Sequence, residues 1–124
     1  NTIYIPTTID TQKLHNQIKT HKNKSKIVIG WTGSFSTMIY LDMVYDVVKE
    51  LAQKYAIEFH IISNEAPKID ENLIIYKAWN KQTEIDDLMC FDIGIMPLFD
   101  TEWEEGKCGF KALQYMSLGI PAVV

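Results

Sequence analysis

The chain has 124 residues and a formal net charge of −4 at pH 7, with 47% hydrophobic and 23% charged residues. This length corresponds to one domain with a core of its own, and this composition is that of an ordinary globular protein. Together they exclude a disordered tail, a collagen-like fibre and a disulfide scaffold, and no apolar run reaches the roughly 20 residues that cross a bilayer.

Residues 1–25 are predicted to lead into the domain without joining its core. Residues 1–10 have the pattern of a short extended piece that ends in turn residues, and a weak helical pattern runs from Leu14 to Ile18. Five lysines and no acidic residue fall within residues 13–26. Such a run can contact nucleic acid or an anionic membrane face, but in this acidic chain we interpret it as a solvated linker or helix face.

The next residues predict a βαβ unit. The apolar run Lys26–Trp31 is typical of a strand buried on both faces, and residues 32–37 supply turn and helix-capping residues. Ile57–Ile62 is predicted to be the second strand, joined to the first by a right-handed connection. The helix between them is predicted to reach Tyr55, because apolar residues recur at intervals of three and four. These residues are Leu41, Val44, Tyr45, Val48, Leu51, Ala52 and Tyr55.

The alternation of strands and helices continues along the chain. Three further strands are predicted, at Leu73–Tyr76, Ile93–Met96 and Ala122–Val124. A short helix capped by Thr83 reaches about Cys90. A longer helix covers Gly109–Leu118 and ends at Gly119, with Phe110, Leu113 and Met116 as its buried stripe. The fold class predicted from this pattern is α/β, a Rossmann-like open parallel sheet with helices on both faces.

Open parallel sheets bind ligands beyond the carboxyl ends of their strands. Two such segments suit a phosphorylated ligand. Gly33 allows close backbone approach beside a helix start, which favours an anion. In the second segment, Lys107 and Lys111 stand near a helix start and suit a diphosphate, while Gln114 on the same helix face suits a pair of sugar hydroxyls. The alternatives are an ordinary tight turn at Gly33 and a solvated surface at Lys111 and Gln114.

Neither the cysteines nor the acidic residues lead us to expect a metal site. Cys90 and Cys108 lack the neighbouring ligands that zinc needs, and they are predicted to be free thiols of a cytoplasmic protein. Residues 100–105 contain four carboxylates, which could bind Mg²⁺. We interpret them as a solvated loop.

Four segments resemble the donor-binding C-terminal domain of GT-B glycosyltransferases, in the glycosyl transferases group 1 family (GT4-like). The sequence from Lys111 to Val124, with its Gly119-Ile-Pro121 turn, is similar to the helix and strand that close the nucleotide-sugar site of this family. Residues 3–10 resemble the linker into the donor domain, residues 27–34 its first strand and loop, and residues 93–98 the strand before the closing motif. The resemblance covers nearly the whole chain in the expected order.

The resemblance implies roles for individual residues. Gly33 and Ser34 would approach the donor diphosphate, and Lys111, as the catalytic residue, would stabilise the leaving nucleoside diphosphate with help from Lys107. Gly109 and Phe110 would bind substrate from the glycine-containing loop at the helix start. Trp79 would lie near the base, either stacked on it or packed in the protein.

Two positions depart from the family pattern. Gln114 stands where the family has the second glutamate of its E-x7-E motif, which holds the ribose hydroxyls. Eight residues earlier the chain has Gly106, with Glu105 just before it, so the first glutamate is missing or shifted. The donor sugar is therefore not predicted.

The sequence thus predicts the donor-binding part of a hexosyltransferase-type enzyme, which transfers a sugar from a nucleotide-diphosphate sugar without a metal or other cofactor. The acceptor, a saccharide or lipid-linked glycan, would be held by an N-terminal domain outside this chain, and the whole enzyme could contact a membrane peripherally. Residues 1–25 would be the interdomain linker and residues 26–124 a nucleotide-sugar-binding domain incomplete at its C-terminus. The chain alone is expected to bind nucleotide without turnover and to self-associate near Val124, and no nucleic-acid partner is expected.

Two alternatives stay open at this point. A non-catalytic module of flavodoxin or receiver type would need acidic residues after its first strand, and none follows Trp31 directly. A dinucleotide-binding regulatory module would be expected to carry Gly-x-Gly-x-x-Gly after that strand, and the chain lacks this motif.

Overall fold

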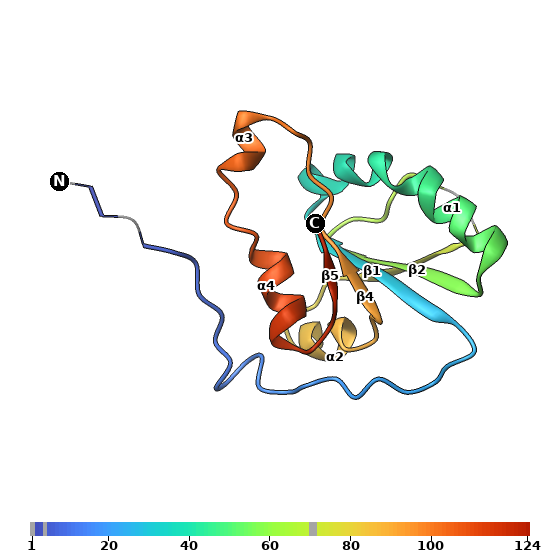
Figure 1. Cartoon of the computed structure of the whole chain (residues 1–124), viewed down its shortest axis with the longest axis horizontal. Coiled ribbons are helices and arrows are strands. Elements are labelled where there is room, and N and C mark those ends of the chain that lie inside the picture. Colours follow the sequence, from blue (N-terminus) through green and yellow to red (C-terminus); the bar gives the residue numbers. More distant parts are fainter. Residues whose placement is uncertain (1, 4, 70–71) are drawn as a thin grey trace.

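The computed structural model describes residues 2–3, 5–69 and 72–124. Figure 1 shows a sheet with helices on both sides and an amino-terminal segment that runs beneath it. The described strands are β1 (Ile27–Gly33), β2 (Ile57–Ser63), β3 (Ile74–Ala78), β4 (Ile93–Ile95) and β5 (Ala122–Val123). All neighbouring strands are parallel, in the order β3-β2-β1-β4-β5. The predicted α/β fold, an open parallel sheet of Rossmann-like type, is confirmed.

The strand order places a switch point at the centre of the sheet. From β1 the chain moves outward to β2 and β3, then crosses back to the other side of β1 to form β4 and β5. The connections after β1 and β4 therefore leave the sheet in opposite directions, and a crevice opens between them. Both segments singled out in the sequence, after β1 and after β4, meet at this crevice.

The helices are η1 (Phe35–Met43), α1 (Tyr45–Lys54), α2 (Glu84–Leu88), α3 (Glu102–Glu105) and α4 (Phe110–Ser117). The prediction of one continuous helix up to Tyr55 is wrong, because η1 is a 3₁₀ helix that gives way to α1 at Val44. The Thr37 hydroxyl donates to the Ser34 carbonyl at 2.9 Å, a local bond that competes with regular helix geometry. None of the helices in the described ranges is long and apolar enough to cross a membrane.

Each face of the sheet carries its own core. On one face, the core between the sheet and the helices η1 and α1 contains the buried residues Ile29, Trp31, Leu41, Val48, Phe59, Ile61 and Ile95. On the other face α2 and α4 cover Val28, Ile62, Leu88, Phe91, Tyr115, Leu118 and Ile120. The two sets alternate along β1 and β2, as expected for strands buried on both faces.

The buried face of α4 differs from the predicted stripe of Phe110, Leu113 and Met116. Phe110 and Met116 are 39% and 55% exposed, whereas Tyr115 is fully buried. The ring of Tyr115 lies over Gly94 of β4, where an added Cβ would come within 2.4 Å of Tyr115 Cδ2. This close approach of α4 to β4 decides which face of the helix is buried, and no spacing of apolar residues encodes it.

Residues 15–24, which we call the amino-terminal strap, pack against the domain. The Lys19 ammonium donates to the carbonyls of Met89 at 2.7 Å and Phe91 at 2.6 Å, and it lies 3.1 Å from Asp92 Oδ1. Lys24 pairs with the same carboxylate at 2.9 Å. The prediction of a solvated lead-in outside the core is therefore wrong for Lys19, which is 8% exposed. The weak helical pattern from Leu14 to Ile18 forms no helix.

Acid is expected to weaken the attachment of the strap through Asp92. Partial burial raises the pKa of this carboxyl, but the Val28 N–H and the ammonium groups of Lys24 and Lys19 outweigh this effect and hold the pKa below its ordinary value. A lowered folded-state pKa stabilises the fold above the unfolded pKa, and this contribution is lost as pH falls through the folded pKa. Between about pH 5 and pH 2, the urea midpoint should fall further for the wild type than for Asp92→Asn.

The control for this measurement is Asp42→Asn, a change at an exposed residue of η1. This variant should keep the pH profile of the wild type. Parallel profiles for the wild type and Asp92→Asn would contradict the role given to Asp92.

Candidate functional site

Two adjoining cavities lie at the carboxyl ends of β1 and β4, and both are lined by Phe110 and Lys111. The first cavity has a volume of about 380 Å³ and lies between η1, the segment after β4 and the start of α4. The second has a volume of about 280 Å³ and lies between the loop after β1, the segment after β3 and α4. Two cavities of the molecule therefore lie at the switch point of the sheet.

The residues predicted to form the site all line these cavities. Lys107 and Gly109 line the first, and Phe110 and Lys111 line both. The second cavity also gathers four residues from three parts of the chain: Gly33, Ser34, Trp79 and Gln114. The structure thus brings the eight residues together, while the role of each in binding stays a prediction.

Gly33 is required by the packing beneath the loop. A Cβ at this position would lie 2.3 Å from Trp31 Cζ2 and 2.8 Å from Thr37 Oγ1, so a side chain has no room. The loop after Gly33 is also tied across the sheet, because the Phe35 N–H donates to Asn64 Oδ1 at 2.7 Å. The loop therefore presents a compact backbone to the second cavity.

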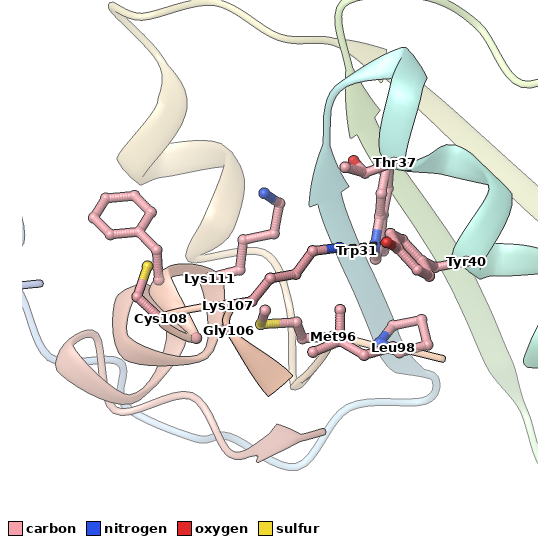
Figure 2. Close-up of a pocket in the computed structure, with 12 residues that line it drawn as sticks. Trp31, Thr37, Tyr40, Met96, Leu98, Gly106, Lys107, Cys108 and Lys111 are labelled. Atoms are coloured by element: carbon pink, nitrogen blue, oxygen red, sulfur yellow. Dashed lines mark hydrogen bonds between the residues drawn. The ribbon is translucent and has the colours of Figure 1, made fainter. Parts of the chain in front are cut away.

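Lys107 is held by partners from η1 and α3, as Figure 2 shows for its approach to Tyr40. Its ammonium donates to the Tyr40 hydroxyl, lies 4.1 Å from the centre of that ring and 3.6 Å from Glu104 Oε1. Hydrogen bonds from the Thr101 and Tyr40 hydroxyls lower the pKa of Glu104. The charge of Lys107 is thus largely compensated within the protein, which makes this lysine a weaker candidate for a diphosphate ligand.

Glu104 also corrects the interpretation of residues 100–105 as a solvated loop. Glu102–Glu105 forms the short helix α3, and Glu104 is only 8% exposed. Thr101 and Lys107 lie three residues from Glu104, but Tyr40 lies 64 positions before it. The run of carboxylates alone therefore did not indicate that Glu104 is buried. Within the described residues, no group of three or more His, Cys, Asp or Glu side chains could hold a metal ion.

Lys111 differs from Lys107 in its surroundings. Burial lowers the pKa of the Lys111 ammonium and the nearby charge of Lys107 lowers it further, while Cys108 and Glu84 act in the opposite direction. No side chain or carbonyl among the described residues forms a hydrogen bond or ion pair with this ammonium. A bound anion would stabilise the charged form of the Lys111 ammonium. Of the two lysines, Lys111 is therefore the better candidate for binding a phosphate group.

Gln114 is 5% exposed and already has neighbours. Its amide nitrogen lies 3.3 Å from His15 Nε2 and 3.4 Å from Glu84 Oε1. The sequence did not predict either neighbour as part of the site. Glu84 follows Thr83 directly, so a wider search after the third strand would have included it. His15 gave no such signal, because it lies in a polar segment far from every strand.

Trp79 and Cys108 complete the lining. Trp79 is 44% exposed, and its backbone N–H donates to the Ser63 carbonyl at 2.9 Å, which fixes the segment after β3. Cys90 and Cys108 are both free and exposed. Hydrogen bonds from the Thr7 hydroxyl and the Phe110 N–H lower the pKa of the Cys108 thiol.

Comparison of the chain with protein-family models, with curated proteins and with solved structures gives no significant match in any of the three. The function is therefore inferred from the geometry of the two cavities.

Proposed function

We propose that the chain is the donor-binding domain of a GT-B glycosyltransferase similar to the group 1 family, and that its cavities bind a nucleotide-diphosphate sugar. The observation that carries this proposal is the meeting of three features at the switch point. These are the glycine loop at Gly33, the unpaired ammonium of Lys111 and the buried amide of Gln114. In the complete enzyme the sugar would pass to an acceptor hydroxyl held by a separate N-terminal domain.

The chemistry assigned to Lys111 follows from its environment. Transfer of the sugar leaves negative charge on the departing nucleoside diphosphate, and a fixed cation stabilises that charge best where water is partly excluded. Lys111 is half-buried and has no carboxylate bonded to it in the described chain. Its charge is therefore available to a phosphate group.

The strand order also separates the proposal from its alternatives. Flavodoxin-like sheets have the order 2-1-3-4-5, whereas this sheet has the order β3-β2-β1-β4-β5 of nucleotide-binding Rossmann folds. This difference counts against a flavodoxin or receiver module. A dinucleotide module remains less well supported, because the loop after β1 lacks the Gly-x-Gly-x-x-Gly sequence that would receive a pyrophosphate.

Titration of the ¹⁵N-labelled chain with UDP and with GDP tests the proposal. We expect amide shifts at Gly33, Lys111 and Gln114, with a smaller effect at sites away from the cavities. Lys111→Ala should weaken binding by tenfold or more, because a hydrogen bond to a charged group contributes about 1.5–3 kcal/mol.

Lys54→Ala is the matched control, since Lys54 is an exposed lysine of α1 that lines neither cavity. It should bind nucleotide as the wild type does. The proposal is wrong if saturating nucleotide shifts none of the three amides, or if the two lysine variants bind equally well.

A further inference from the structure

We infer that Glu84 reads the vicinal hydroxyl pair of a ribose, so that the second cavity distinguishes ribonucleotides from 2′-deoxyribonucleotides. This inference rests on the proposed function and names the part of the donor that contacts α2. The sequence did not point to Glu84, and its role follows from the groups that the fold places around it.

The second cavity combines four chemically different side chains. Lys111 supplies a positive charge, Glu84 a carboxylate, Gln114 an amide and Trp79 a flat, partly exposed indole. A purely anionic ligand would be attracted by Lys111 and repelled by Glu84. The lining therefore suits a ligand that is charged at one end and carries neutral hydroxyl groups and a flat ring elsewhere.

The orientation of the Gln114 amide follows from its neighbours. Its nitrogen lies 3.4 Å from Glu84 Oε1, and the reverse orientation would place the amide oxygen against that carboxylate. The same nitrogen lies 3.3 Å from His15 Nε2, which accepts the second amide proton. Both donors of Gln114 are thus directed at protein groups, and its oxygen is left as an acceptor.

Glu84 and Gln114 therefore offer acceptors side by side. A carboxylate has about four lone-pair positions, of which Gln114 engages one. A vicinal diol carries two O–H donors on neighbouring carbons, and hydrogen bonds to an ionised carboxylate are the stronger kind. Glu84 is partly buried and Gln114 is buried, so loss of one hydroxyl leaves part of this acceptor set without a donor.

The charges also orient the nucleotide along the cavities. The diphosphate of the nucleotide would lie toward Lys111, which lines both cavities. Its ribose would lie toward Glu84, which lines the second cavity but not the first. Trp79 is 44% exposed, and its indole offers a surface on which a base can stack. The ribose is thus the part of the ligand that meets the carboxylate.

Paired titrations with UDP and 2′-deoxy-UDP, followed by ¹⁵N NMR, test the inference. For the wild type we expect 2′-deoxy-UDP to bind about tenfold more weakly than UDP. Glu84→Gln keeps the shape but removes the charge, so the ratio should fall to about threefold, and Glu84→Ala should abolish the preference. Asp86→Asn, a change at an exposed residue of the same helix that does not line the cavity, should keep the wild-type ratio.

The outcomes separate this inference from the proposed function. Binding of neither nucleotide would overturn both. Equal binding of UDP and 2′-deoxy-UDP to the wild type would show that Glu84 does not recognise the ribose hydroxyl pair, and it would not contradict the proposed function. If the two Glu84 variants weakened both ligands equally, Glu84 would only shape the cavity, and the inference would be wrong. Dispersed spectra of the variants would show that they are folded.

Discussion

Gly30→Ala is expected to lower the free energy of unfolding by about 3 kcal/mol, because the added methyl group has no space. Gly30 lies in the central strand β1, paired with His60 on one side and Gly94 on the other. A Cβ built on it would come within 2.1 Å of Phe91 Cδ1 and Cγ. Phe91 is completely buried and packs beside Tyr115, with 6.0 Å between ring centres, so its ring has little freedom to move away.

Urea denaturation would measure this effect, with Gly106→Ala as the matched control. At Gly106 the nearest atom to an added Cβ is the Trp103 carbonyl oxygen, at 3.5 Å, which is an ordinary contact. We expect that variant to change stability by less than about 1 kcal/mol. Gly30→Ala should also cost less in a Phe91→Leu background, where the ring is gone. Equal midpoints for the two glycine variants would contradict the close packing.

The second large effect is expected for Lys19→Met, which keeps most of the apolar stem and removes the ammonium. The carbonyls of Met89 and Phe91 would lose a donor in a buried place, and Asp92 would lose one of its two lysine partners. Removing one partner of a buried ion pair costs about 3–5 kcal/mol. We expect a loss near the lower end of that range, about 3 kcal/mol, because Lys24 still pairs with Asp92.

Lys24→Met provides the comparison within the same cluster. The Lys24 side chain is 40% exposed, and exposed ion pairs contribute roughly 1 kcal/mol or less. Thermal unfolding should therefore separate the two variants clearly. Similar unfolding temperatures would show that the buried ammonium of Lys19 contributes no more to stability than the exposed ammonium of Lys24.

Much of the fold could be predicted because local sequence patterns indicate where the strands lie. The run Lys26–Trp31 is apolar almost throughout, which is typical of a strand covered on both faces of a parallel sheet. The location of the cavities followed from the same reasoning, since ligands bind beyond the carboxyl ends of such strands. The presence of Gly33, Lys111 and Gln114 at one place needed only the topology.

The remaining features depend on contacts that no local pattern records. Lys19 is polar and lies in a lysine-rich run, and its burial is explained by the carbonyls of Met89 and Phe91, between α2 and β4, together with the Asp92 carboxylate. Glu104 is buried because Tyr40 and Thr101 supply hydrogen bonds from η1 and from the turn before α3. Glu84 reaches the site because α2 lies beside α4 in the folded chain.

The amino-terminal strap determines when the chain can complete its structure during synthesis. Lys19 is synthesised before the residues that hold it, because the carbonyls that accept its hydrogen bonds belong to residues 70 and 72 positions later. His15 and His21 must wait 99 and 98 positions for Gln114 and Gly119. Contacts across such separations close slowly, because a long loop must first be ordered. The strap is therefore made before every described strand of the sheet and is one of the last parts of the described chain to be secured.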